Sequence, residues 1–222
     1  MAIILLVNGN TNQVLTEQMV GQARSVALEG TRIVGLTPRF GERFVQNRAQ
    51  EIVAAHAVLD AVETYPDPYD AVLVAISMDS AVFALRERLS VPVIGMTEAS
   101  CHFAHMSGQF FSAVTADLSA IDSYHERIDA FGMGQKLKSI RGLGMTPQRA
   151  YDARNDIVER LAQLIESMLL EDGSESVVLL GVAFSGLERE LRRLVKVPVF
   201  SGITCGTLML DSVLKLNAND LN

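Results

Sequence analysis

The chain has 222 residues, of which 49% are hydrophobic and 20% are charged, as in an ordinary folded globular protein. Its formal net charge of −7 argues against nucleic acid as a partner, because nucleic-acid binders concentrate Lys and Arg on one surface. No apolar run reaches the roughly 18–20 residues of a membrane span, and the opening AIILLV is too short for a signal peptide. We therefore expect a cytoplasmic protein with neither a membrane nor a nucleic-acid partner.

Short runs of apolar and β-branched residues recur along the whole chain and predict eight strands. Most of these runs are continuous rather than alternating, which is typical of strands buried on both faces of a parallel sheet. In chain order the predicted strands span residues 3–7, 32–37, 71–76, 91–96, 110–116, 137–143, 176–182 and 197–203.

Helical patterns lie between the predicted strands. Residues 146–170 predict one long helix, with Thr146 as N-cap and Pro147 in the first helical position. Alternating strands and helices indicate right-handed crossovers and a parallel sheet. Another helix, over residues 49–63, is predicted to bury one stripe formed by Ile52, Val53, Leu59 and Val62.

The chain also repeats itself over a long period. The segment from Asp70 reads DAVLVAISMDSAVFALRERLSVPVIGM, and the segment from Glu175 reads ESVVLLGVAFSGLERELRRLVKVPVFSG. Their VPV motifs start at Val91 and Val197, 106 positions apart, and the other strands pair at nearly the same separation. The repeat predicts an α/β fold of two pseudo-symmetric lobes, each a four-stranded parallel sheet flanked by helices.

The repeat also predicts where the lobes begin and end. Residues 1–98 plus 207–222 are expected to form the first lobe, and residues 99–206 the second. In this arrangement the segment 207–216 forms a helix that packs back on the first lobe. Ligands bind beyond the carboxyl ends of strands in open parallel sheets. Two such sheets facing each other would share one cleft, where we expect a small-molecule substrate.

Polar residues follow the first strand of each half. Asn8 and Thr115 stand at equivalent strand ends and are candidates to hydrogen-bond a carboxylate, amide or carbonyl group of a substrate. Asn10 and Thr11 follow Asn8 in the same loop and are further candidates. The alternative is that these residues only cap helices or stabilise turns, as Asn and Thr commonly do.

The third strand of each half runs into a turn before a helix. Backbone N–H groups near Ser77 and Ala183 are expected to form a cradle for an anion or a carbonyl oxygen. Ser185 and Glu188 have the spacing of a capping box, so we interpret Ser185 as a helix cap. Ser77 has no comparable capping role and remains a site candidate.

The two cysteines follow the fourth strands. Cys101 is adjacent to His102 and close to His105, but adjacent Cys and His cannot easily bind one ion from a helix, and no fourth ligand is apparent. We therefore expect no metal. A buried structural role is the ordinary alternative to a reactive one for Cys101 and Cys205.

Several of these segments together resemble the aspartate/glutamate racemase superfamily, most closely its hydantoin/allantoin racemase branch. The similar segments are VNGNTN, DAVLVAISMDSAVFALRERLSVPVIGMTEAS, FSAVTA, SIRGL, LLGVAFSGL and VPVFSGI. The resemblance implies a two-lobed, cofactor-free homo-oligomer with one cysteine at the end of each third strand. One thiolate would remove the proton α to a carbonyl, and the other thiol would deliver a proton to the opposite face.

The chain departs from that pattern at its centre. Ile76 and Val182 occupy the positions where the resemblance places the two cysteines, and neither side chain carries an exchangeable proton. A shift of one residue would offer Ser77 in the first half, but serine is a weak base unless it is activated. The remaining candidates for proton transfer are Asp79 and Cys205. Ile76, Val182 and Ala183 would then line the substrate pocket.

The loop after the second strand differs too. It reads TPRFGERF, where the resemblance implies a small glycine-proline loop. Arg39 or Arg43 would clamp an anionic substrate, with Phe40 or Phe44 as an apolar cover. Ordinary surface arginines are the alternative.

Three functions remain open from the sequence. The first is a racemase-superfamily enzyme with altered chemistry, an isomerase, lyase or hydrolase acting on a small carboxylate, amide or cyclic ureide. The second is a hydantoin or amino-acid racemase with displaced catalytic groups. The third is a noncatalytic small-molecule binder that kept the cleft and lost the acid/base pair.

Overall fold

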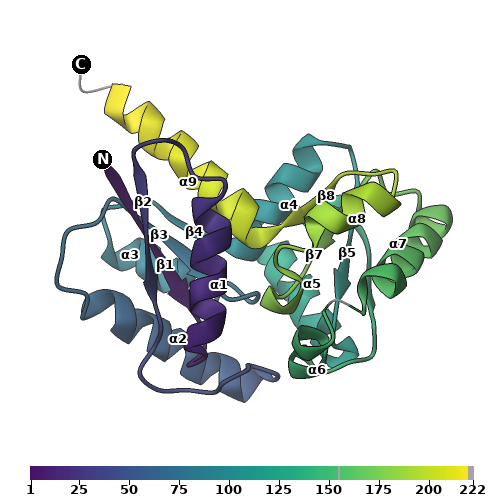
Figure 1. Cartoon of the computed structure of the whole chain (residues 1–222), viewed down its shortest axis with the longest axis horizontal. Coiled ribbons are helices and arrows are strands. Elements are labelled where there is room, and N and C mark those ends of the chain that lie inside the picture. Colours follow the sequence, from purple (N-terminus) through teal and green to yellow (C-terminus); the bar gives the residue numbers. More distant parts are fainter. Residues whose placement is uncertain (155, 220–222) are drawn as a thin grey trace. The chain divides into compact units, whose positions relative to one another are not determined.

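The computed structural model describes residues 1–154 and 156–219 and divides the chain into two compact units (Figure 1). The first unit is Met1–Met96 together with the chain from Ile203, and the second is Thr97–Gly202. Each unit holds one parallel four-stranded sheet, with strand orders β2-β1-β3-β4 and β6-β5-β7-β8. The predicted fold class is confirmed. Within the described ranges, no helix combines the length and apolar character needed to cross a membrane.

The first unit alternates strands and helices along the chain. Its elements are β1 (Ala2–Asn8), α1 (Gln13–Arg24), β2 (Thr31–Leu36), α2 (Arg48–Glu63), β3 (Ala71–Ala75), α3 (Val82–Arg88), β4 (Val93–Gly95) and the C-terminal α9 (Gly202–Asn219).

The second unit follows the same order, with additional short 3-10 helices. After α4 (Met96–Met106), which begins at the boundary, come β5 (Phe111–Thr115), η1 (Leu118–Ala120), α5 (Ile121–Ala130), η2 (Gly134–Lys136), β6 (Leu137–Gly142), α6 (Pro147–Asp152), α7 (Val158–Asp172), β7 (Ser176–Leu179), η3 (Val182–Phe184), α8 (Glu188–Leu194) and β8 (Val199–Ser201). All eight predicted strands are therefore present in the part of the chain that the structure describes.

The two sheets repeat part of their hydrogen-bond register. The strand β3 pairs with β1 and β4 at positions equivalent to those at which β7 pairs with β5 and β8, whereas the register of β5 with β6 shifts between Phe111 and Ala113. The equivalent pairs are Ile4–Ala71 with Phe111–Ser176, and Val72–Val93 with Val177–Val199.

A side-chain contact is duplicated as well. The Arg86 guanidinium donates from Nε and Nη2 to the carbonyl oxygen of Val93, at 3.0 and 2.8 Å. Arg192 makes the same pair of bonds to Val199, at 3.0 and 2.7 Å. The basic residues that end α3 and α8 thus fasten each helix to the strand that follows it.

The predicted stripe on the helix over 49–63 is correct for Val62, which is buried, and for Leu59, which packs on the core, but wrong for Ile52 and Val53. Ile52 is 73% exposed and Val53 is 43% exposed in α2. The buried face is turned by about one residue because small alanine side chains let the helix approach the sheet. Its buried residues are Ala54, Ala57, Val58 and Val62.

The predicted long helix over 146–170 is two helices, α6 and α7. Its predicted start is confirmed, because Thr146 Oγ1 accepts a hydrogen bond from the Arg149 N–H at 3.3 Å. The break after α6 lets that helix pack on η3, while α7 packs on α8 and β6. The sequence predicted a single helix because Ile157, which lies between α6 and α7, is also buried and so continues the helical spacing of apolar residues.

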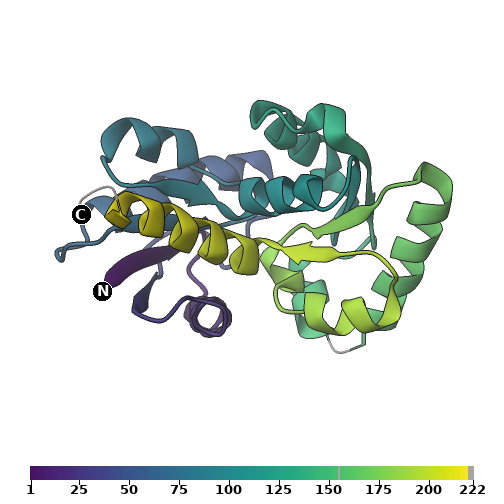
Figure 2. The same ribbon diagram turned by 90° about the horizontal axis from the view of Figure 1, so that it is seen from above.

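The C-terminal segment forms a helix, as predicted, and it is one continuous helix in Figure 2. Asp211 of α9 is 3% exposed. Its carboxylate accepts hydrogen bonds from the Leu28 N–H at 2.8 Å and from Thr31 Oγ1 at 2.6 Å. The polar contact of Asp211 therefore fastens α9 to the segment between α1 and β2.

We predict that Asp211→Ala lowers the free energy of unfolding by about 1–3 kcal/mol, because a buried N–H and a hydroxyl lose their acceptor. The neighbouring Ser212 is exposed and bonds only within α9, to the Leu208 carbonyl. Ser212→Ala is the matched control and should change stability by less than about 0.5 kcal/mol. Chemical denaturation measures both, and equal effects would contradict the assigned role of Asp211.

Candidate functional site

The carboxyl end of β1 carries a buried polar network centred on Asn8. The Asn8 side chain is fully buried, and its Nδ2 lies 3.0 Å from both Asn10 Oδ1 and Thr16 Oγ1. Nδ2 also lies 3.2 Å from the carbonyl oxygen of Asn12, and Asn8 Oδ1 accepts from the Asn10 N–H at 3.2 Å. Asn8 thus orders the loop before α1. A substrate would have to replace one of these bonds, so direct binding by Asn8 stays a prediction.

The next two candidates also hold this loop. Asn10 Oδ1 accepts from the Asn12 N–H at 3.0 Å, which closes a turn. The Thr11 N–H and hydroxyl both donate to the carbonyl oxygen of Glu42, at 3.0 and 3.3 Å. The loop after β1 is therefore joined to the loop after β2.

The second unit has a corresponding turn. Thr115 ends β5 as Asn8 ends β1, and it is 3% exposed. Two residues later, Asp117 Oδ1 accepts from the Ser119 N–H at 2.9 Å, as Asn10 does for Asn12. Asn10 therefore stabilises a turn, which is the alternative to substrate binding given in the sequence analysis. Binding of substrate by Thr115 stays a prediction.

Ile76 fills the space between β3 and the Asn8 loop. It is 6% exposed and belongs to the hydrophobic cluster that includes Val7, Val74 and Val82. A Cβ atom added at Gly9 would lie 2.4 Å from Ile76 Cδ1 and 2.5 Å from Ile76 Cβ. Gly9 is therefore required for this close approach, and residue 76 lies against the loop that carries the polar network.

The turns after β3 and β7 each contain a backbone hydrogen bond between residues three apart. The Asp79 N–H donates to the carbonyl oxygen of Ile76 at 2.8 Å, and the Ser185 N–H donates to that of Val182 at 3.1 Å. Ile76 is the first residue after β3, whereas Val182 lies three residues after Leu179, the last residue of β7. Val182 is half-buried, and the Ala183 side chain behind it is buried.

The turn before α3 is strained. Asp79 has φ of 47° and Ala81 has φ of 70°, and they are the two non-glycine residues with positive φ in the described chain. A left-handed conformation costs about 1–2 kcal/mol at a residue with a side chain. Such strain is concentrated at functional sites. The turn holds the Asp79 carboxylate fully buried against Gly95, where a Cβ atom would lie 2.2 Å from Asp79 Cγ.

Ser80 is a site candidate that sequence reasoning missed. It follows Asp79 and is 2% exposed, and its Oγ has no hydrogen-bond partner among the described residues. A buried hydroxyl without a partner costs about 1–3 kcal/mol, so its retention calls for an explanation. No sequence pattern marks Ser80, because it is the strained turn that places this hydroxyl in the interior.

The predicted capping box in the second unit is wrong. The helix α8 begins at Glu188 and its N-cap is Leu187, so Ser185 does not occupy the N-cap position that the box requires. Ser185 directly follows the 3-10 helix η3, and Gly186 after it has φ of 92°. The carbonyl oxygen of Ser185 accepts from Arg154 Nη2 at 2.7 Å.

Glu188 is consequently a second candidate that the sequence analysis missed. Its side chain is 2% exposed, so it places a buried carboxylate close to the turn that begins at Val182. The burial of Glu188 was not predicted, because the capping-box spacing predicts a partly solvated glutamate at the start of a helix. Its position in the first turn of α8 is equivalent to the first turn of α3 in the other unit.

Two residues of the loop after β2 contact the helix α2. The Phe40 ring packs edge-on against His56 of α2, with centroids 5.1 Å apart. Arg39 Nη2 pairs with Asp60 Oδ2 at 3.1 Å, also on α2, whereas Arg43 is exposed. Of the candidates in this loop, Phe40 thus contacts α2, and a substrate contact by Phe40 or Arg43 stays a prediction.

The two cysteines lie on helices that follow the fourth strands. Cys101 of α4 is fully buried and Cys205 of α9 is 2% exposed, and they are not joined in a disulfide. A Cβ atom added at Gly206 would lie 2.4 Å from Leu73 Cδ1, so the turn that carries Cys205 packs closely on β3. Across residues 1–154 and 156–219, no group of three or more His, Cys, Asp or Glu residues could hold a metal ion.

Two equivalent parallel sheets, each with loops and turns of matching geometry at its carboxyl edge, define the class of duplicated racemase-type α/β proteins. The family model described as Asp/Glu/Hydantoin racemase matches residues 4–210. The chain belongs to this family.

Relatives of known name agree with that assignment. The hydantoin racemase of Paenarthrobacter aurescens is 27% identical over 215 residues, covering 96% of this chain and 91% of the relative. The crystal structure of allantoin racemase from Pseudomonas fluorescens has 34% identity and a TM-score of 0.94, covering 97% of this chain and 92% of that one. Allantoin racemase from Klebsiella pneumoniae has 28% identity and a TM-score of 0.91, covering 98% and 89%.

We predict that Gly9→Ala lowers the free energy of unfolding by about 1–3 kcal/mol, because the added methyl group overlaps Ile76. Gly21 in α1 is the matched control, because a Cβ atom there meets nothing within 4 Å. Gly21→Ala should raise stability by about 0.5–1 kcal/mol through helix propensity. Urea unfolding measures both variants, and a neutral Gly9→Ala would contradict the close packing described here.

Proposed function

We propose that this protein is a racemase-family enzyme that acts on a small cyclic ureide, or a related amide or carboxylate, without proton transfer between two thiols. The observation that carries the proposal is the pair Ile76 and Val182. These residues lie in the turns after β3 and β7, where the family resemblance predicts the proton-carrying cysteines.

Racemisation by two groups requires a base on one face of the reacting carbon and an acid on the other. Ile and Val side chains can neither accept nor donate a proton. The thiols that the chain has, Cys101 and Cys205, are buried on α4 and α9, not in the turns that follow β3 and β7. An altered reaction with a single acid/base group is consistent with these positions.

Asp79 is the group that we assign to proton transfer. Its carboxylate is held by a strained turn, three residues after Ile76. A carboxylate can take a proton from one position of a substrate and, once protonated, return it, as an isomerisation by a single acid/base group requires. The neighbouring Ser80 hydroxyl is suited to donate a hydrogen bond to a carbonyl oxygen that becomes negative in the transition state.

The substrate class follows from the relatives. Hydantoin and allantoin are both five-membered cyclic ureides, and the relatives named after them match nearly the whole chain. Ile76, Val182 and Ala183 would supply apolar contacts to such a ring, and Asn8, Thr115 and the backbone N–H groups near Ser77 would bind its polar edge. A noncatalytic binder would use the same contacts.

We predict that the wild-type protein does not racemise an optically pure 5-substituted hydantoin, because it has no thiol in the turns after β3 and β7. The double variant Ile76→Cys/Val182→Cys should gain exchange and racemisation of an optically pure 5-substituted hydantoin, because it places a thiol in both turns. NMR follows the exchange, and polarimetry follows the racemisation.

The single variants Ile76→Cys and Val182→Cys are the matched controls, and each should remain without racemase activity. If the wild-type protein itself racemises hydantoins, and Cys205→Ala abolishes this activity, the proposal is wrong and the displaced-thiol racemase is correct. Stabilisation by a hydantoin without any turnover would instead favour the noncatalytic binder.

We further predict opposite results for the two candidate proton carriers. With a cyclic ureide that the protein turns over, Asp79→Asn should lower kcat by about 100-fold or more, because the isosteric amide cannot accept the proton. Cys205→Ala should leave kcat within about threefold of wild type. Thermal unfolding checks that both variants are folded. Loss of activity in Cys205→Ala alone would reverse the assignment.

A further inference from the structure

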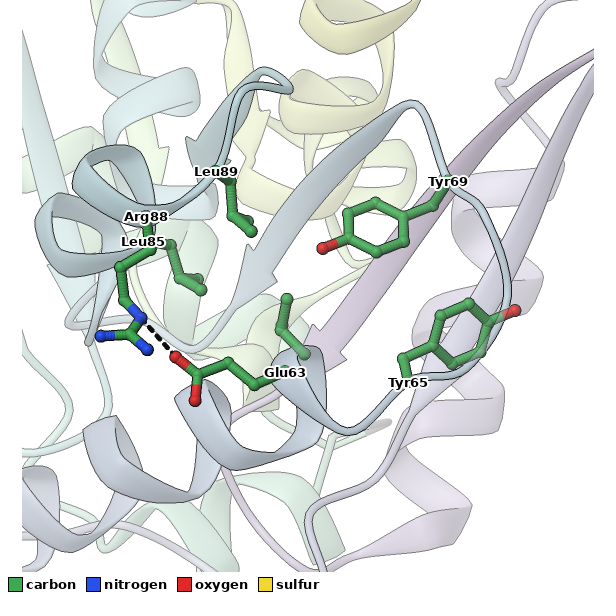
Figure 3. A pocket seen from close by; sticks show the side chains of 7 residues that line it. Glu63, Tyr65, Tyr69, Leu85, Arg88 and Leu89 are labelled. Carbon is green, nitrogen blue, oxygen red and sulfur yellow. Dashed lines mark ion pairs between the residues drawn. The ribbon is translucent and has the colours of Figure 1, made fainter.

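A cavity of ≈ 380 Å³ lies at the other edge of the first sheet (Figure 3). It is formed by the end of α2, the segment 64–70 that leads into β3, and the last turns of α3. The segment 64–70 enters β3 at its amino end, whereas the turn containing Ile76 leaves β3 at its carboxyl end. The cavity is therefore separate from the site proposed above, and its size is at the lower end of the range for small-molecule sites.

The cavity has an apolar floor and a polar rim. Val62 and Leu85 are buried at its base. Figure 3 shows the Tyr69 hydroxyl directed toward Leu85 and Leu89, while Tyr65 points its hydroxyl away. Burial raises the pKa of Tyr69, which is consistent with a hydroxyl partly withdrawn from water.

The rim opposite the tyrosines holds an ion pair between Arg88 and Glu63. Arg88 comes from the last turn of α3 and Glu63 from the last turn of α2, so the pair joins the two helices across the cavity. It presents hydrogen-bond donors and acceptors side by side with no net charge.

The duplication supplies an internal comparison for the segment 64–70. The equivalent segment in the second unit is only 173–175, and it has no aromatic residue. Both segments end in the same way, because the Asp70 N–H donates to the Ile3 carbonyl at 2.8 Å and the Glu175 N–H donates to that of Phe110 at 3.0 Å. The fold therefore needs only the short connection, and the extra residues are those that build the cavity wall.

The extra residues are also conformationally restricted. They read TYPDPYD, with Pro66 and Pro68 each fixing a backbone φ angle. The rings of Tyr65 and Tyr69 contact edge to face, with centroids 6.1 Å apart. A preformed aromatic wall loses little conformational entropy when it binds a ligand.

We propose that this cavity is a second binding site, for a small uncharged molecule with an aromatic or cyclic body and an amide-type edge. The body would contact Val62, Leu85, Leu89 and the Tyr69 ring. An amide edge offers a carbonyl oxygen to Arg88 and an N–H to Glu63 at the same time. A carboxylate or an amine would instead have to compete with one partner of the existing ion pair.

The test is a ligand-observed NMR titration of the full chain with benzamide, using benzoate and benzylamine as charged probes of similar shape. Benzamide should bind, and both charged probes should bind about tenfold more weakly or not at all. The proposal is overturned if benzamide does not bind, or if a charged probe binds more tightly.

Variants locate the bound probe. Tyr69→Ala and Arg88→Gln should each weaken benzamide binding by about tenfold, because each removes one wall contact or one donor. The controls are Arg39→Gln, which alters an ion pair elsewhere on α2, and Asp79→Asn at the other edge of the sheet. Both controls should bind benzamide as wild type does. Loss of binding in Asp79→Asn, with Tyr69→Ala unchanged, would place the probe at the other site and overturn this proposal without affecting the first.

Discussion

The hydrogen-bond register of the central strands is the constraint on which the rest of the structure depends. The bonds from Asp70 to Ile3 and from Glu175 to Phe110 start the two sheets at equivalent positions. A slip of one residue would exchange the two faces of a strand. Because the pairings of β3 with β1 and β4 recur in β7 with β5 and β8, Ile76 and Val182 both lie in the turn that leaves the corresponding strand of each sheet.

Continuous apolar runs were sufficient to predict the strands, because a strand buried on both faces must be apolar at every position. Helix faces were harder to predict from hydrophobicity. In α2 the close packing of Ala54 and Ala57 decided which face is buried, and Ile52 was left in solvent. At the candidate site, the residue types at strand ends could be predicted, but not their hydrogen bonds. The Asn8 side chain, for example, donates to the hydroxyl of Thr16 in α1. The residue types at the end of β1 do not predict this bond.

The largest failure concerned the turns, where backbone conformation decides the role of a side chain. Ser185 and Glu188 have the spacing of a capping box, yet Gly186 at positive φ inserts a turn that no pattern of polar residues reveals. In the first unit, Asp79 and Ala81 adopt positive φ without being glycine, so nothing in their identity predicts the strain. The turn conformations were missed in both units, and the turn of the first unit is strained because its positive φ values fall on Asp79 and Ala81.

The two edges of the first sheet differ in what the fold requires of them. At the carboxyl edge, Ile76 packs closely against Gly9. At the amino edge, the fold needs only a short connection, as the second unit shows. A residue that packing does not demand requires another explanation. The strain at Asp79 and the additional aromatic residues around Tyr69 are two such features, and the two binding sites that we propose would explain both.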